Sequence, residues 1–318
     1  MKRYSTAVNL TSRSLISRAT ELGACTLLLV AASFAAQPPS ASSHPDPAEL
    51  MRESVDNEIS AAKDDTAHFL FRGIKTTPKG STTRLYVETN EATAGLVIGY
   101  NGQSLSPEQH HDEEARVERF INDPEEMKKK REQERQNTER TLRIMRAMPD
   151  AFVFEYAGEE PGSETAGRPG DPLIKLTFRP NPGYQPPSHV EEVLPGMQGY
   201  VLLDVTHHRI ARIDGTLFKE VAFGWGILGH LDRGGRFIVQ QQEVGDNLWE
   251  ISSMTLNFTG KILFFKNLNI NSTETFSRFK RVSADLTFAQ AFELLKKEEA
   301  STATETADKT AASKVDHE

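Results

Sequence analysis

The sequence predicts an α+β protein: a strongly twisted antiparallel sheet, arranged as a half-barrel and packed against helices. Residues 198–282 form a nearly continuous series of alternating strand patterns, from GYVLLDV to KILFFKNLNI and beyond. Gly, Asp, Asn or His-His stands at most of the joins, a spacing that is typical of a meander. Helical patterns lie outside this series, at residues 47–63, 106–148 and 286–299. This separation of strands from helices favours the α+β class.

The N-terminus has the layout of a secretory signal peptide. The first twenty residues are basic without an acid, and an apolar run from Leu22 to Ala36 follows. Ser33 and Ala35 occupy the −3 and −1 positions of a cleavage site, so we expect cleavage after Ala35 and a polar, Pro-rich linker over 36–46. The apolar run is short for a transmembrane helix. We therefore expect a periplasmic or secreted protein.

Composition excludes several classes of function. Cys25, the single cysteine, begins the apolar run instead of ending it, so it does not fit a lipoprotein box. Cleavage after Ala35 would remove it, which leaves no disulfide, thiolate metal site or thiol chemistry in the mature chain. The net charge of −8 argues against nucleic acid as a partner. A hydrophobic content of 37% is adequate for a core.

The chain before the meander predicts a helix and three strands, followed by a helical insertion over 106–148. Residues 47–63 place Leu50, Val55 and Ile59 near one helical face, and AHFLFRGIK, TRLYVETN and TAGLVIGYNG read as strands. Asn101-Gly102 favours a tight turn. Ser106-Pro107-Glu108-Gln109 is a capping box, and Asp123-Pro124-Glu125-Glu126 repeats the device, so two helices follow.

The first inserted helix is predicted to bury Val117, Phe120 and Ile121. The second becomes apolar only at Leu142, Met145 and Met148, so its first half is expected to project into solvent. Its basic run, 128–131, is interpreted as a solvated helix face, with a docking surface for acidic partners as the alternative. After two strands and an irregular loop at 161–172, Ser188 is predicted to cap a short helix that ends at Pro195-Gly196. Residues 299–318 are predicted to be a disordered tail.

Polar residues with catalytic or ligand chemistry do not form a diagnostic motif. His110 or His111 can meet Glu114 on a helix face, but the third zinc ligand is not evident, so a hydrated helix N-terminus is the preferred interpretation. His207-His208 is interpreted as a hairpin tip. The acids Asp204, Asp214 and Glu243 are candidates for acid–base work only if the fold pairs them. We assign no catalytic residue, no metal and no cofactor.

Large apolar side chains are denser in the meander than one solvent-facing sheet needs. KILFFKNLNI carries bulky residues on both faces, so we expect that strand to be covered on both sides. A filled core is one interpretation, and a cavity for an apolar ligand is the other. The candidate ligand-binding residues, on either face, are Trp225, Phe237, Trp249, Phe258, Leu263 and Phe265.

Two resemblances add to these patterns. The mature chain resembles an uncharacterised family of exported bacterial proteins through NGQSLSPEQ, PDAFVFEYAGEE, LTFRPNPGYQPPS, VLPGMQGYVLLD, FGWGILGHLDRGGRF and ILFFKN. From Met197 to Val282 its strand pattern is also similar to the LolA, LolB and RseB group of periplasmic proteins. That resemblance implies a half-barrel closed by helices around an apolar cavity, and a binding module for acyl chains, lipoproteins or an envelope partner. The inserted helices depart from that simple plan.

The sequence therefore predicts a signal peptide (1–35), a linker (36–46), a single α+β domain (47–298) and the tail (299–318). The preferred function is non-enzymatic binding of an apolar ligand, an acyl chain or a lipoprotein, in the periplasm. An envelope scaffold or regulatory partner with a packed core is the first alternative, and a secreted hydrolase is the second.

Overall fold

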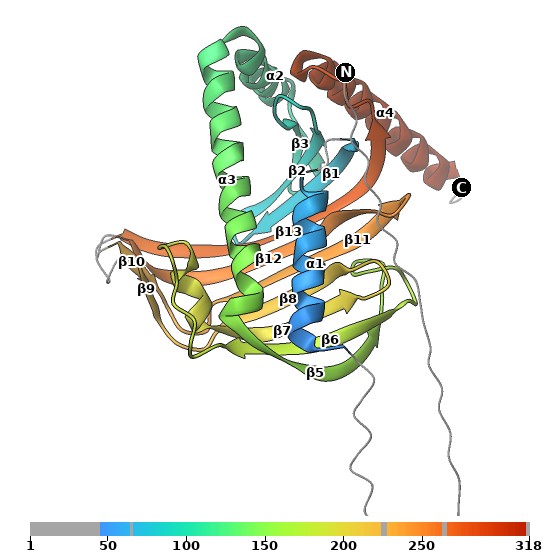
Figure 1. Cartoon of the computed structure of the whole chain (residues 1–318). Coiled ribbons are helices and arrows are strands. Elements are labelled where there is room, and N and C mark those ends of the chain that lie inside the picture. The colour runs from blue at the N-terminus through green and yellow to red at the C-terminus, as the bar shows by residue number, and fades with distance from the viewer. Residues whose placement is uncertain (1–44, 64–65, 224–227, 263–265, 316–318) are drawn as a thin grey trace, which may run out of the picture. The chain divides into compact units, whose positions relative to one another are not determined.

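The computed structural model describes residues 45–63, 66–223, 228–262 and 266–315, with side chains up to Ser301. All of these residues belong to one compact unit, His44–Glu318. Its centre is a single sheet of 13 strands that is not closed, and all paired strands are antiparallel. Helices pack on this sheet (Figure 1). The predicted α+β class with a large antiparallel sheet is thus confirmed.

The sheet is a meander joined to a second set of strands by one long-range pairing. Its order is β4-β3-β2-β1-β13-β12-β11-β8-β7-β6-β5, with β10 attached to β12 and β9 to β10. Only the contact of β1 with β13 joins strands from opposite ends of the chain, with His68 opposite Val282. The bounds are β1 His68–Thr77, β2 Gly80–Val87, β3 Ala94–Tyr100, β4 Gln103–Ser104, β5 Phe152–Pro161, β6 Pro172–Pro180, β7 Met197–Asp204, β8 Arg209–Leu217, β9 Val221–Phe223, β10 Gly229–Leu231, β11 Arg236–Gly245, β12 Leu248–Ile262 and β13 Lys266–Val282.

The helices begin where the sequence places their caps. Asp46 caps α1 (Pro47–Ala61), and Ser106 forms the predicted capping box of α2 (Pro107–Asn122). Asp123 ends α2 and accepts the N–H groups of Glu125 and Glu126, so α3 (Pro124–Ala151) follows at once. The short helix predicted after Ser188 is the 3-10 helix η1 (Glu191–Gly196), and α4 (Phe288–Val315) follows β13. Among the described residues, no helix is long and apolar enough to cross a membrane.

Helices α1 and α3 cover one face of the sheet over β5 to β8, and we call this the inner face (Figure 1). Their apolar side chains pack on inward-facing residues of these strands, for example Leu50 of α1 and Met148 of α3 against Leu176 and Val201. This main core is filled at that end of the sheet. Phe237 and Phe258 extend its rim onto β11 and β12. Antiparallel register places every second residue of these strands on this face.

The opposite, outer face carries a helix at the other end of the sheet. Leu85 and Val87 of β2 are buried with Phe288 and Phe292 of α4, and Val117 of α2 joins this second core. Side chains alternate along a strand, so Tyr86 between them points to the inner face. Arg84, two residues before Tyr86, pairs with Gly73 of β1, and Lys75 on the same face of β1 pairs with Glu274 of β13. From Glu274 the pairs run through Met254 of β12 and Val239 of β11 to Ile213, which packs on the main core, so the two helix layers lie on opposite faces.

The loop predicted to be irregular between β5 and β6 folds over the outer face. Gly167 N–H donates to the Gln241 carbonyl at 2.8 Å, and Arg168 forms an ion pair with Glu243 at 2.7 Å. Ala166 is buried by this contact. Beside the loop, Trp249 packs with Leu173, Leu202 and Ala211 in a third, smaller cluster.

Four expectations differ from the structure. KILFFKNLNI is not one strand covered on both sides: β12 ends at Ile262, which is 38% exposed, and β13 begins at Lys266. Residues 263–265, between the two strands, lie outside the described residues. Ile121 is exposed, because Val117 and Phe120 alone face the second core. Helix α4 runs past residue 298 to Val315, and this stretch has no Gly or Pro to stop it. Disorder of the tail stays a prediction.

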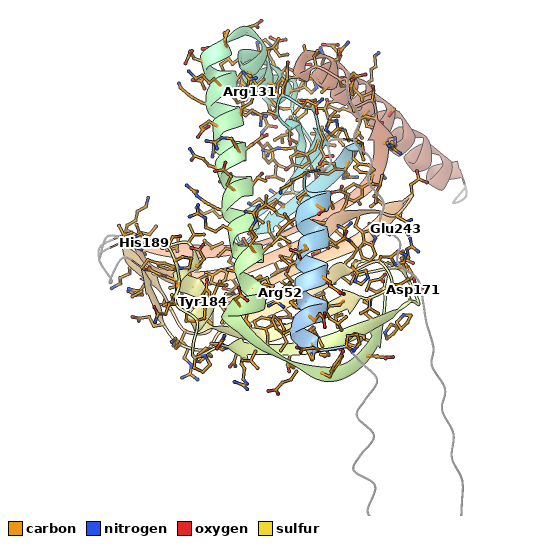
Figure 2. The ribbon with its side chains drawn as sticks, viewed as in Figure 1. Arg52, Arg131, Asp171, Tyr184, His189 and Glu243 are labelled. Carbon is orange, nitrogen blue, oxygen red and sulfur yellow. The ribbon has the colours of Figure 1, made fainter. Side chains whose placement is uncertain are left out.

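The first half of α3, the fourth difference, does not project freely. Met127 is buried in the second core, and the Glu134 carboxylate accepts the N–H of Thr93 at 3.1 Å. The basic run 128–131 nevertheless lies mostly in solvent, and Figure 2 shows Arg131 on this part of α3. The helix is therefore held at both ends of the sheet while its polar face stays exposed.

A buried ion pair fixes α1 to the tip of the β7–β8 hairpin. The Arg209 guanidinium donates two hydrogen bonds of 2.9 Å to the Glu58 carboxylate, which also accepts the N–H of Ile210. The exposed fractions of the two side chains are 9% and 6%. Asn57 donates to the carbonyl oxygens of His207 and His208, so the predicted hairpin tip is confirmed and is also the docking point of α1.

We predict that Glu58→Ala lowers the free energy of unfolding by about 3–5 kcal/mol, because it leaves the Arg209 charge buried without a partner. Urea denaturation measures this. The control is Arg52→Ala, which breaks an exposed pair with Asp150 and should cost at most about 1 kcal/mol. Equal losses in the two variants would contradict a special role for Glu58.

Candidate functional site

The inner face of β1, β2 and β13 carries four aromatic side chains that are only half-buried. Phe71, Tyr86, Phe276 and Phe279 belong to none of the three apolar clusters described above, and we call them the inner aromatic cluster. At this end of the sheet α4 covers the outer face, whereas these inner-face rings stay partly exposed. The result is apolar surface that is accessible to a ligand.

The rings of the inner aromatic cluster pack on one another across three strands. Phe71 stacks on Tyr86 with ring centroids 5.0 Å apart and on Phe279 at 5.3 Å, and it meets Phe276 edge to face at 5.9 Å. Gly73 makes this packing possible, since a Cβ atom there would lie 2.8 Å from the Tyr86 ring. The cluster is therefore a preformed surface built on strands.

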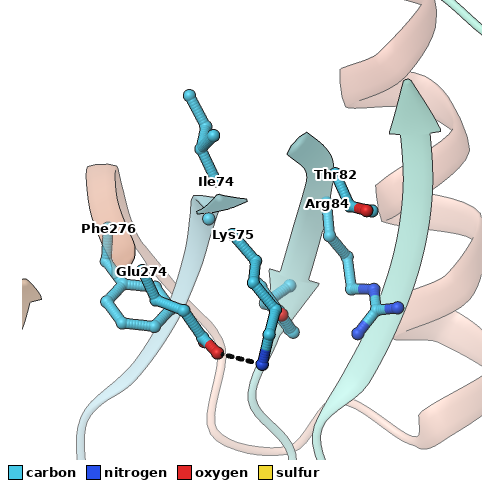
Figure 3. A pocket seen from close by; sticks show the side chains of 8 residues that line it. Ile74, Lys75, Thr82, Arg84, Glu274 and Phe276 are labelled. Carbon is cyan, nitrogen blue, oxygen red and sulfur yellow. Dashed lines mark hydrogen bonds and ion pairs between the residues drawn. The ribbon is translucent and has the colours of Figure 1, made fainter. Parts of the chain in front are cut away.

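A pocket adjoins the cluster, lined by Gly73, Ile74, Lys75, Thr82, Arg84, Tyr86, Glu274 and Phe276. It encloses about 460 Å³ of empty space, part of which is open to solvent, so it is a recess and not a closed cavity. Figure 3 shows Lys75, Arg84 and Glu274 extending to the same side. The Lys75 ammonium forms an ion pair with Glu274 at 2.5 Å.

A second recess, of about 430 Å³, continues past Arg84 and Tyr86 toward α2 and α3. Here Arg116 donates to Glu113 and to the carbonyl of Gly95, and Lys130 forms an ion pair with Glu134 at 2.5 Å. Phe120 supplies an apolar wall with both cations over its ring. The two recesses together combine aromatic surface with an excess of positive groups.

The six ligand-binding residues predicted from sequence are not gathered at this place. Phe237 and Phe258 lie half-buried on the inner face at the rim of the main core. Trp249, 6% exposed, packs into the third cluster with outer-face residues. Trp225, Leu263 and Phe265 lie outside the described residues. Their role in binding stays a prediction.

The acids considered for acid–base chemistry each have a structural partner. Asp204 accepts the N–H groups of Thr206 and His207 and contacts the His207 ring at 2.9 Å, which closes the hairpin turn. Burial alone would raise the pKa of Asp214, but hydrogen bonds from Arg236 and Arg212 more than offset burial and lower that pKa. Glu243 holds Arg168 of the outer loop. None of these acids faces the two recesses, so the arrangement offers them no acid–base role there.

A carboxyl with a strongly raised pKa lies between the main core and β1. Burial, followed by repulsion from Glu88, raises the pKa of Glu250 to about 8, while Arg209 acts in the opposite sense. Burial also raises the pKa of Glu88, although its carboxylate accepts the N–H of Phe69 at 3.0 Å. At neutral pH Glu250 is therefore largely protonated. Sequence periodicity does not predict that Glu250 and Glu88 lie close together, because the two residues are far apart in the chain.

Two groups of ligand-type side chains meet elsewhere. His110 lies 3.7 Å from Glu114, as its spacing predicts, and its other ring nitrogen lies 3.0 Å from Glu299 of α4. Beside β9 and β10, ligand atoms of Glu220, His230 and Asp232 lie within 4.8 Å of one another, a set that could hold a divalent cation. Exposed acidic groups often gather in this way without a metal, and neither group adjoins the inner recesses.

The chain is similar to two solved structures at low sequence identity. No family model matches this chain, and no curated protein matches it. It is similar to the solved structure of an outer membrane lipoprotein-sorting protein domain from Vibrio parahaemolyticus, at 11% identity and a TM-score of 0.31, over 78% of this chain and 99% of that one. It is also similar to a DUF1329 family protein from Desulfovibrio piger, at 9% identity and a TM-score of 0.28, over 79% and 100%. Because both TM-scores are low, we base the proposed function on this chain's own residues.

The sequence did not predict the inner aromatic cluster, because its four residues belong to three strands that are separate in the chain. One signal was present: Tyr86 alternates with Leu85 and Val87, and Phe276 and Phe279 stand among charged residues of TFSRFKR. When a strand carries bulky side chains on both faces and a helix covers only one face, the apolar surface of the other face stays uncovered.

We predict that Glu250 makes the protein less stable as pH rises from 4.5 to 8. In this window the folded state binds more protons than the unfolded state, so the free energy of unfolding falls with pH, by at most about 1.4 kcal/mol per pH unit. Glu250→Gln should flatten this slope, measured by urea denaturation across the window. Glu159→Gln, at an exposed position of β5, is the control. A slope that is the same in all three proteins would contradict the assignment.

Proposed function

We propose that this chain is an exported, non-enzymatic binding protein for an apolar ligand, an acyl chain or the acyl chains of a lipoprotein, and that it acts in the periplasm. The observation that carries the proposal is the inner aromatic cluster: four half-buried rings beside an open recess, on the face that α1 and α3 cover over β5 to β8. The N-terminal export pattern supports the compartment.

Burial of apolar surface provides enough free energy for such a role. A methylene group transferred from water contributes about 0.8 kcal/mol, so a dozen carbons contribute on the order of 10 kcal/mol before ordering costs. The rings are held by strands and by Gly73, so little order is lost in the protein on binding. Affinity for an apolar ligand requires no polar motif.

An envelope scaffold or regulatory partner is the alternative, and the filled main core under α1 and α3 favours it. In that role the exposed polar face of α3 would provide the contact surface. Native mass spectrometry of protein purified from its own envelope separates the two, since co-purified lipid supports the carrier and its absence supports the scaffold.

We predict that Phe276→Ala weakens binding of the uncharged dye N-phenyl-1-naphthylamine about tenfold, because the dye loses ring contact worth 1–2 kcal/mol. Fluorescence titration measures the affinity. Because Phe276 is only half-buried, this substitution should cost less stability than the roughly 3–5 kcal/mol typical of a buried ring.

The matched control is Phe154→Ala in the main core. It should show the full loss of stability and unchanged dye affinity when both are measured well below the unfolding temperature. No dye binding by the parent protein, or equal weakening in both variants, would sink the proposal.

A further inference from the structure

Arg84 lies at the junction of the two inner recesses and has no acidic partner among the described residues. It lines both of them, and its guanidinium carbon lies 5.8 Å from the centroid of the Tyr86 ring. Its Nε atom is buried and has no hydrogen-bond partner. A buried donor without an acceptor is destabilising, so the hydrogen-bonding capacity of this guanidinium is not satisfied within the described part of the chain.

The neighbouring cations are already neutralised. Lys75 is paired with Glu274, Lys130 with Glu134 and Arg116 with Glu113, each within 2.7 Å. Arg84 therefore gives the two recesses one uncompensated positive charge, in a chain whose net charge is −8. Local positive charge in an acidic protein selects anions over cations.

The surroundings of Arg84 are apolar on one side. Tyr86 and Phe276 line the same recess and continue into the inner aromatic cluster. A planar guanidinium binds carboxylate or phosphate oxygens through two parallel N–H bonds, and the rings next to it accept methylene groups. A free inorganic anion would use only the first of these features.

We propose that Arg84 binds the anionic head, a carboxylate or a phosphate monoester, of an amphiphile whose acyl chain lies on the inner aromatic cluster. This inference rests on the proposed function and specifies the ligand class. The head lies at the junction of the two recesses, and the chain extends over Tyr86 and Phe276. Arg84 then sets the orientation of the ligand, while the rings provide most of the affinity.

The test uses calorimetric titration of the mature protein with dodecanoate, dodecyl phosphate, dodecanol and inorganic phosphate. Arg84→Gln should weaken both anionic amphiphiles by about tenfold or more, the loss expected for a charge-assisted hydrogen bond, and should leave dodecanol unchanged. Arg84→Lys keeps the charge and should retain part of the preference for the anionic probes. Arg179→Gln removes an exposed cation paired with Glu155 away from both recesses and should change nothing.

The outcomes separate this inference from the proposed function. Parent protein that binds no amphiphile contradicts both. Binding of dodecanol and dodecanoate with equal affinity, unaffected by Arg84→Gln, overturns the headgroup site and leaves apolar binding intact. If Arg84→Gln weakens the binding of dodecanol as much as that of the anionic amphiphiles, Arg84 has a structural role and the headgroup site is overturned. The headgroup site is also overturned if inorganic phosphate binds as tightly as dodecyl phosphate. Circular dichroism of each variant confirms that it is folded.

Discussion

One continuous sheet is covered by helices on opposite faces at its two ends, and the rest of the structure depends on this arrangement. Over β5 to β8 the helices α1 and α3 fill the inner face, and over β1 to β3 the helix α4 fills the outer face. Each apolar strand face needs a covering layer. Because the helices change from the inner face to the outer face along the sheet, the inner-face residues of β1, β2 and β13 lack a complete helical layer. The inner aromatic cluster occupies this uncovered surface. The candidate site is thus a consequence of how the two cores are built.

Buried polar groups hold the two ends of this arrangement together. Glu58 fixes α1 to the β7–β8 hairpin through Arg209, and Glu134 fixes the first half of α3 to Thr93 beside β3. Between the cores lies Glu250, whose raised pKa reflects burial near Glu88 and Glu58. Such groups stabilise little compared with apolar packing, but leaving one unpaired is costly. They therefore fix the position of the helices over the sheet and, with it, the opening beside β1 and β2.

Local features were predictable from the sequence because short-range chemistry determines them. Asn101 and Gly102 adopt positive φ values of 52° and 77° in the expected turn, and Ser106 forms the expected capping box. The antiparallel class followed from alternation along the strands. The pairing of β1 with β13 had no local signal, since His68 and Val282 lie at opposite ends of the domain. The inner aromatic cluster exists only through that pairing, so the sequence pattern pointed to residues 225–265 instead. The break between β12 and β13 had no local signal either, because KILFFKNLNI contains no Gly, Pro or Asp.

The central claim is that an acyl chain lies on the inner face of β1, β2 and β13. Paramagnetic broadening of amide signals by a stearate that carries a nitroxide near its methyl end tests this most directly. We expect the strongest broadening at Gly73, Tyr86 and Phe276, with little at the filled main core around Leu176. Broadening centred on the outer face around Trp249, or none at saturating stearate, would contradict it.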